Sequence, residues 1–150
     1  MRQLISLTDH LIKAGFCSPE QIDSWTENGE FELNGETTAT GIYPFDYTYQ
    51  GIIILQEVSV DLNYILGLVS CWLLEHDPER ERLELGNPSF SGDPFDDGTS
   101  DLEIRLKFYE KPHYSPGTGE GAIIINSISY IPSEYSEDVA EELEGVLVND

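Results

Sequence analysis

The sequence predicts an α+β domain in which a mostly antiparallel sheet of four to five strands carries a long central helix packed across it and an N-terminal helix. Two segments with helical spacing alternate along the chain with several strand-like segments, an order typical of α+β folds. The length of 150 residues fits one domain, and eight Tyr and six Phe argue against disorder. We therefore expect one domain over residues 1–131 and an acidic C-terminal segment over 132–150.

The first helix is expected over residues 3–14, where Leu4, Leu7 and Leu11 recur at helical spacing before Gly15. Towards the C-terminus, residues 136–148 carry a thin apolar stripe behind a possible N-cap, so this segment is expected as a helix or as a flexible arm.

The central helix is expected over residues 60–76, where apolar residues form nearly the whole circumference. One face holds Leu62, Ile65, Leu66, Val69, Trp72 and Leu73. The opposite face holds Tyr64, Leu68 and Cys71, which predicts burial from two sides and a small buried thiol at Cys71. One of these two sides would be covered by the sheet, and the other either by the N-terminal helix or by a neighbouring subunit.

Strands are expected where apolar and polar residues alternate. Residues 42–56 begin with alternating aromatic residues and continue as an apolar run, and residues 102–109 alternate apolar with charged side chains. Residues 122–131 are β-branched and predict one final strand, whereas 83–90 predict a shorter one.

Two interpretations remain open for residues 18–35. Ser18 and Gln21 frame a capping box that would start a short helix reaching Trp25. The pair Asn28 and Gly29 instead favours a two-residue hairpin turn, because both central positions of a type I′ turn need positive φ. We favour the hairpin.

The charge is the most unusual property of the composition. Seven Lys and Arg stand against 29 Asp and Glu, a formal net charge of −22. Such a chain repels nucleic-acid backbones and anionic membranes and is steered towards basic partners, although acidity can also serve solubility alone. With two cysteines, no secretory signal and no apolar run of the ~20 residues that span a bilayer, we expect a cytoplasmic protein.

No motif for catalysis or for cofactor or metal binding is complete. None of the three histidines lies in a nucleophile motif, and no Gly-rich phosphate loop or zinc spacing occurs. The acidic stretch from Asp93 approaches a calcium loop, but Phe95 and Ile104 occupy two positions that need oxygen ligands. We expect no enzyme and no cofactor, with a metal-dependent protein centred on residues 93–101 as the weakest alternative.

Several packing patterns resemble the tail completion protein R family of contractile-tailed temperate phages. Residues 45–49 read F-D-Y-T-Y and run into an apolar strand, and the helix that follows ends in V-S-C-W-L before His76, Asp77 and Pro78. The later strand D-L-E-I-R-L, from Asp101, also fits. The resemblance covers roughly residues 40–112, with a looser fit over 19–35, and the acidic end after Tyr130 departs from the pattern.

The resemblance implies a structural tail completion, or tail terminator, protein that caps the tail tube or sheath and supports head–tail joining. The implied partners are tube, sheath and head–tail connector proteins, and the implied assembly is a homo-oligomeric ring, a hexamer on the sixfold axis of the tail. It implies a location in the bacterial cytoplasm and then in the virion tail. A distinct hypothesis is an acidic immunity protein that neutralises a basic toxin, which the charge fits equally well.

Interface residues are expected on two loops and on the second face of the central helix, because binding residues often lie on loops held by a rigid scaffold. The loops span residues 91–101 and 112–121. The candidates are Asp93, Phe95, Asp96, Asp97, Asp101, His113, Tyr114, Tyr64 and Leu68.

Overall fold

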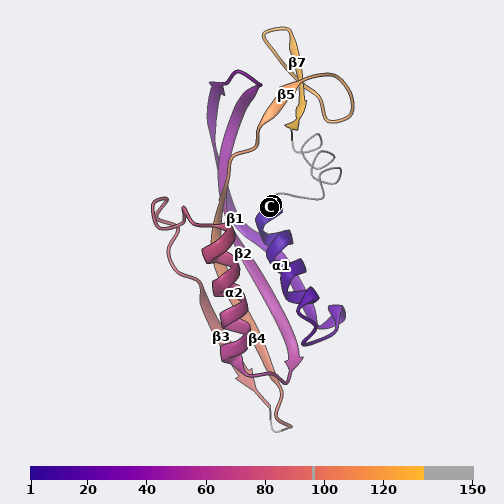
Figure 1. The fold of residues 1–150 in the computed structure, drawn as a ribbon, viewed down its shortest axis with the longest axis vertical. Helices are drawn as coiled ribbons and strands as arrows, with labels where there is room; N and C mark the ends of the chain where they lie inside the picture. The colour runs from indigo at the N-terminus through magenta and orange to yellow at the C-terminus, as the bar shows by residue number, and fades with distance from the viewer. Residues whose placement is uncertain (96, 134–150) are drawn as a thin grey trace. The chain divides into compact units, whose positions relative to one another are not determined.

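The computed structural model describes residues 1–95 and 97–133 and contains two helices and seven strands in that part of the chain. The elements are α1 (Arg2–Lys13), a 3-10 turn (Pro19–Gln21), β1 (Ile22–Thr37), β2 (Ile42–Val58), α2 (Leu62–His76), β3 (Ser89–Pro94), β4 (Ser100–Glu110), β5 (Tyr114–Pro116), β6 (Ile123–Ile125) and β7 (Ile128–Pro132) (Figure 1). The α+β class is confirmed, but the sheet has more than the four to five strands expected.

The chain forms two compact units. The first comprises Met1–Glu30 and Thr48–Tyr109, and the second comprises Phe31–Tyr47 and Glu110 onwards. The predicted helix over 136–148, and all but two residues of the acidic segment 132–150, lie outside the described residues.

The core of the first unit lies between the two helices and strands β2 and β4. The helices α1 and α2 pack side by side on the sheet (Figure 1). The Phe108 ring of β4 lies 5.7 Å from Tyr49 of β2 and 6.4 Å edge-on from Trp72 of α2. The Tyr49 hydroxyl accepts a hydrogen bond from the Leu4 backbone N–H. Burial of these large side chains supplies the main stabilisation of this unit, at about 25 cal/mol per Å² of apolar surface.

The central helix is shorter and less enclosed than the sequence predicts. Asp61 caps the N-terminus of α2 by accepting from the Asn63 N–H, and the helix has 15 residues. One side is buried through Ile65, Val69, Trp72 and Leu73. The prediction of burial from two sides is wrong, because α1 lies beside α2 rather than over its outer side. Cys71 is accordingly exposed and not a core residue.

Residues 18–37 contain neither the predicted helix nor the predicted hairpin turn. The capping box of Ser18 and Gln21 is present but starts only the 3-10 turn. Strand β1 then runs straight through Asn28 and Gly29, because only Asn28 takes a positive φ (55°) and a type I′ turn needs two. The chain reverses later, where the Thr38 N–H donates to the Gly41 carbonyl at 2.8 Å.

Strand β3 occupies much of the segment that the sequence predicts as a polar loop. It pairs antiparallel with β4, with Asp93 opposite Asp101 and Phe90 opposite Ile104. The described residues between the two strands are Phe95 and 97–99, and of the strand predicted over 83–90 only Ser89 and Phe90 are strand residues. A hairpin can carry polar side chains in this way because both of its strands satisfy their backbone groups through each other.

The second unit contains the outer part of the β1–β2 hairpin followed by β5, β7 and β6. β5 pairs with β2 through Ile42 and Tyr114, and with β7. The single strand predicted over 122–131 is two strands, because Asn126 and Ser127 both adopt positive φ (52° and 65°) and reverse the chain. β5 lies within the predicted 112–121 loop.

Candidate protein-interaction surfaces

The outer hairpin, residues 31–47 of the second unit, has one apolar face. The rings of Phe31 and Phe45 meet edge to face across the two strands at 6.1 Å, and Phe45 lies 5.9 Å from Tyr47. Leu33 shares this face, because side chains two apart in a strand point the same way. Phe31 is 70% exposed and Leu33 is 87% exposed, so this apolar face lies open to solvent.

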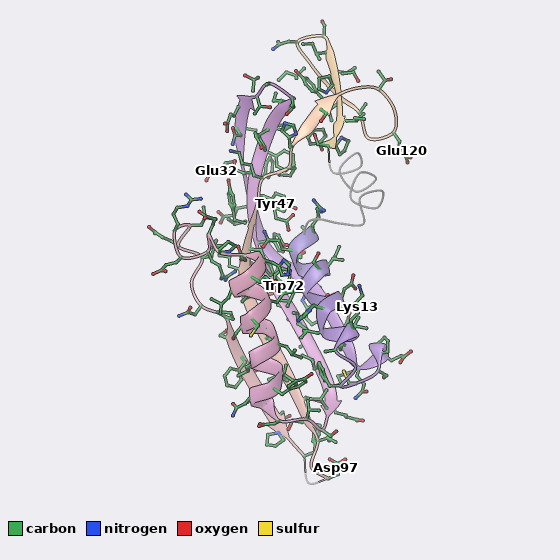
Figure 2. All side chains as sticks on the ribbon, in the orientation of Figure 1. Lys13, Glu32, Tyr47, Trp72, Asp97 and Glu120 are labelled. Atoms are coloured by element: carbon green, nitrogen blue, oxygen red, sulfur yellow. The ribbon has the colours of Figure 1, made fainter. Side chains whose placement is uncertain are left out.

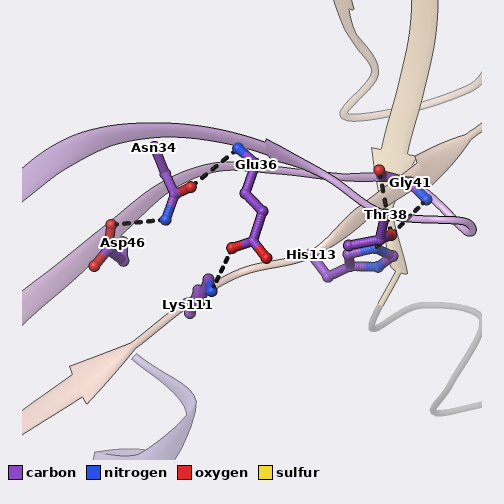
Figure 3. Close-up of polar contacts among 7 residues, drawn as sticks. All are labelled: Asn34, Glu36, Thr38, Gly41, Asp46, Lys111 and His113. Atoms are coloured by element: carbon purple, nitrogen blue, oxygen red, sulfur yellow. Dashed lines mark hydrogen bonds and ion pairs between the residues drawn. The ribbon is translucent and has the colours of Figure 1, made fainter.

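The opposite face of the outer hairpin is acidic and polar. The Asn34 side-chain amide donates to the Asp46 carboxylate at 3.3 Å, which places both on the same face (Figure 3). Glu32 shares the strand alternation of Asn34 and is exposed; Figure 2 labels it on the hairpin. The outer hairpin therefore presents an apolar face on one side and negative charge on the other.

Lys111 links the end of β4 to the outer hairpin. Its ammonium lies 2.8 Å from the Glu36 carboxylate (Figure 3). It also lies 4.4 Å from the centre of the Tyr43 ring. The hydrogen bond that Lys111 donates to Glu36 raises the pKa of Lys111 above its ordinary value. A second contact joins the same elements, because the Tyr47 hydroxyl donates to the Glu110 carboxylate at 3.1 Å.

His113 has a structural position within the second unit. One ring nitrogen lies 3.2 Å from the hydroxyl of Thr38, which Figure 3 draws beside it. The other ring nitrogen lies 2.7 Å from the Ser133 hydroxyl. The imidazole also packs on Tyr43 at 4.8 Å. Tyr114, the other candidate here, sits in β5 opposite Ile42 and is half-buried. Both side chains therefore make contacts within the second unit.

The acidic candidates of the first unit cluster at the β3–β4 turn. The Asp97 carboxylate accepts hydrogen bonds from the Thr99 hydroxyl at 2.6 Å and from its N–H at 3.0 Å, which lower the pKa of Asp97 (Figure 2). Asp101 accepts from the Glu57 N–H at 2.9 Å. Phe95 and Asp93 are exposed there, whereas Asp96 lies outside the described residues. In the parts of the chain that the structure describes, no group of three His, Cys, Asp or Glu gathers as a metal site would require.

The candidates on α2 lie apart from that turn in sequence and on a different element. Tyr64 is 47% exposed and meets the Phe16 ring edge to face at 6.1 Å, and Leu68 is half-buried. Leu74, on the last turn of α2, is 78% exposed. The outer side of α2, defined by Tyr64, Cys71 and Leu74, is therefore a second open surface with apolar side chains.

Sequence reasoning missed Phe31 and Leu33. The available signal was the run Glu30-Phe31-Glu32-Leu33, which alternates acidic and apolar residues in the way that a two-faced strand does. The expected turn at Asn28 and Gly29 hid it, because a hairpin there would have paired this run with the residues just before it.

The family model for P2 phage tail completion protein R (GpR) matches residues 1–133. The chain belongs to this family. It is also similar to an uncharacterized 19.2 kDa protein in the rep-hol intergenic region of Haemophilus phage HP1 (strain HP1c1), with 28% identity over 128 residues that cover 83% of this chain and 76% of that protein.

No solved structure matches the chain. Among the helices of the described residues, none is both long and apolar enough to cross a membrane. The family match confirms the resemblance found in the sequence. It extends that resemblance from residues 40–112 to residues 1–133. It connects the protein to phage tails and therefore to interactions with other tail components.

Proposed function

We propose that this protein completes the phage tail by capping the tube or sheath, and that it supports head–tail joining through protein–protein contacts rather than through catalysis. The observation that carries the proposal is the family match over residues 1–133. The open apolar surfaces support it, because large exposed apolar side chains gathered in one place mark interaction sites.

The copies would assemble as a ring, a hexamer on the axis of the tail. A ring needs two different patches on each subunit, so that each copy gives one patch and receives another. The outer side of α2, defined by Tyr64, Cys71 and Leu74, supplies one such open patch. A closed ring would use one pair of surfaces repeatedly and leave the rest for tube, sheath or connector proteins.

The net charge of −22 suits a position beside a DNA passage. A negative wall repels the phosphate backbone and keeps exiting DNA from sticking. The same charge opposes nucleic-acid binding by the free protein. This part of the proposal requires that acidic residues line the inner surface of the ring.

The test is deletion of the gene from a prophage, followed by induction and electron microscopy of the lysate. We expect heads and uncapped or abnormally long tails that fail to join, and restoration by a plasmid copy. The double variant Tyr64→Ser/Leu74→Ser on α2 should restore joining poorly. The control Ile5→Ser removes an apolar side chain from α1 whose exposed fraction, 60%, lies between those of Tyr64 and Leu74, and it should restore joining fully.

Normal virions from the deleted prophage would contradict the proposal. A tight one-to-one complex with a single basic toxin, recovered from the same lysate, would instead support the immunity hypothesis.

A further inference from the structure

Strand β1 is an edge strand. Its hydrogen-bonded neighbour is β2, and no other described strand pairs with it. Within the outer hairpin, β1 residues 31–34 thus keep one side of their backbone free of strand partners. Unpaired N–H and C=O groups along such an edge are a template for another strand. Proteins use this template to bind extended segments, with main-chain hydrogen bonds giving affinity and alternate side chains giving specificity.

The side chains along this edge specify what can be added. Phe31 and Leu33 project on one face beside Phe45, and Glu32 projects on the other beside Asn34 and Asp46. A strand added to β1 alternates its own side chains between the same two faces. It would therefore place every second residue on the apolar face and the residues between them on the negative face.

We propose that the free edge of β1, residues 31–34, binds an extended segment of another protein in which apolar residues alternate with Lys or Arg. The apolar residues would cover Phe31 and Leu33, and the basic residues would meet Glu32. This inference rests on the proposed function only in naming the partner as a tail component; the binding site itself does not depend on it.

A second copy of this chain is a poor occupant of the site. Glu32 on each edge would oppose pairing of two β1 strands, because like charges directly opposite each other across a strand pair are destabilising. The chain does contain one alternating apolar and basic run around Arg105 and Lys107. That run lies in β4, which pairs with β2 on one side and, up to Arg105, with β3 on the other. The basic strand must therefore come from a different protein.

The first experiment uses a nine-residue fluorescein-labelled peptide that alternates valine and lysine, titrated into the full-length protein and followed by anisotropy. We expect saturable binding, with amide shifts in the NMR spectrum concentrated at residues 31–37. A valine–glutamate peptide should not bind. A valine–lysine peptide N-methylated at alternate residues should bind at least tenfold more weakly, because it cannot complete the strand pairing.

Variants separate edge binding from general attraction to an acidic protein. Phe31→Ser/Leu33→Ser should weaken binding at least tenfold. The control Phe90→Ser removes an exposed aromatic side chain from β3, another edge strand, and should leave binding unchanged. Both changes affect exposed residues, and equal circular dichroism spectra would establish that both variants fold. Absence of binding, insensitivity to N-methylation, or equal effects of the two variants would overturn the inference.

The same variants in the prophage connect the site to tail completion. If both proposals hold, Phe31→Ser/Leu33→Ser blocks head–tail joining and Phe90→Ser does not. If deletion of the whole gene leaves tails normal while the peptide still binds at β1, the proposed function fails and the binding site stands. If deletion blocks joining but the Phe31→Ser/Leu33→Ser variant restores it fully, the function stands and the role of this edge in it is refuted.

Discussion

Asp77 and Arg80 form a buried ion pair immediately after α2. The Arg80 Nη1 atom lies 2.7 Å from the Asp77 carboxylate. The Arg80 side chain is 12% exposed and the Asp77 side chain is 7% exposed. Arg80 also donates to the Gly86 carbonyl at 3.0 Å and lies 5.9 Å from the centre of the Phe108 ring. The pair therefore ties the turns after α2 to the core of the first unit.

Replacement of Arg80 by Met should lower the free energy of unfolding by about 3 kcal/mol, because it leaves the Asp77 carboxylate buried without its partner. Urea denaturation followed by tryptophan fluorescence measures this. Arg82→Met is the matched control, because Arg82 pairs with Glu79 three residues earlier, as Arg80 does with Asp77, but with both side chains largely exposed. The free energy of unfolding should therefore fall by less than about 1 kcal/mol in this variant. Equal losses in the two variants would show that the buried pair has no special role.

Two glycines of the first unit should respond to alanine in opposite directions. A Cβ at Gly51 in β2 would lie 2.9 Å from a methyl group of buried Leu4, so Gly51→Ala should destabilise by about 1–3 kcal/mol through overpacking. A Cβ at Gly67 in α2 meets nothing within 4 Å, and Gly67→Ala should stabilise by up to about 1 kcal/mol because alanine favours the helix. Thermal unfolding of both variants measures these effects. A Gly51→Ala protein as stable as the unchanged protein would contradict the packing of α1 over β2.

Gly41 should be essential for pairing between β2 and β5 in the second unit. A Cβ there would lie 1.9 Å from the Tyr114 carbonyl oxygen, too close for any side chain. In Gly41→Ala we expect amide exchange in β5 to be accelerated about tenfold or more, equivalent to at least about 1.4 kcal/mol. Hydrogen–deuterium exchange with mass spectrometry measures it. Gly29→Ala is the control, since the atom nearest to an added Cβ would be 3.9 Å away. Unchanged amide exchange in Gly41→Ala would contradict the pairing of Ile42 in β2 with Tyr114 in β5.

The two cysteines should react at different rates. Cys71 is exposed on α2, whereas Cys17 is half-buried and burial raises the pKa of its thiol. Iodoacetamide at pH 7.5 should therefore modify Cys71 first, with Cys71→Ser leaving only the slow reaction. Faster modification of Cys17 would contradict the structure. In assembled tails, protection of Cys71 would place the outer side of α2 in a subunit contact.

The sequence was most informative where one local pattern decided the structure. The leucine spacing of α1 and the apolar stripe of α2 fixed both helices to within about two residues, because a buried helical face needs a repeat near 3.6. Alternation in β2 and β4 likewise predicted two strands that the structure contains. The family resemblance in these same segments is confirmed by the match over residues 1–133.

Turn positions were less predictable, because a turn depends on which strand pairs with which. Asn28 and Gly29 form a strong local turn signal, yet pairing with β2 keeps β1 extended and moves the reversal to residues 38–41. Asn126 and Ser127 form a weaker signal, yet pairing of β6 with β7 makes them the turn. In both places, long-range strand pairing outweighed local preference.

The sequence alone determined that this is an acidic α+β protein of the phage tail completion family, since composition, periodicity and family motifs are local properties of the chain. The tertiary structure decided which apolar residues remain open. Cys71 and Leu74 follow the apolar pattern of α2 but stay exposed, because α1 packs beside that helix. Phe31 and Leu33 become a candidate binding edge because β1 pairs with β2 and with no other strand of the described residues.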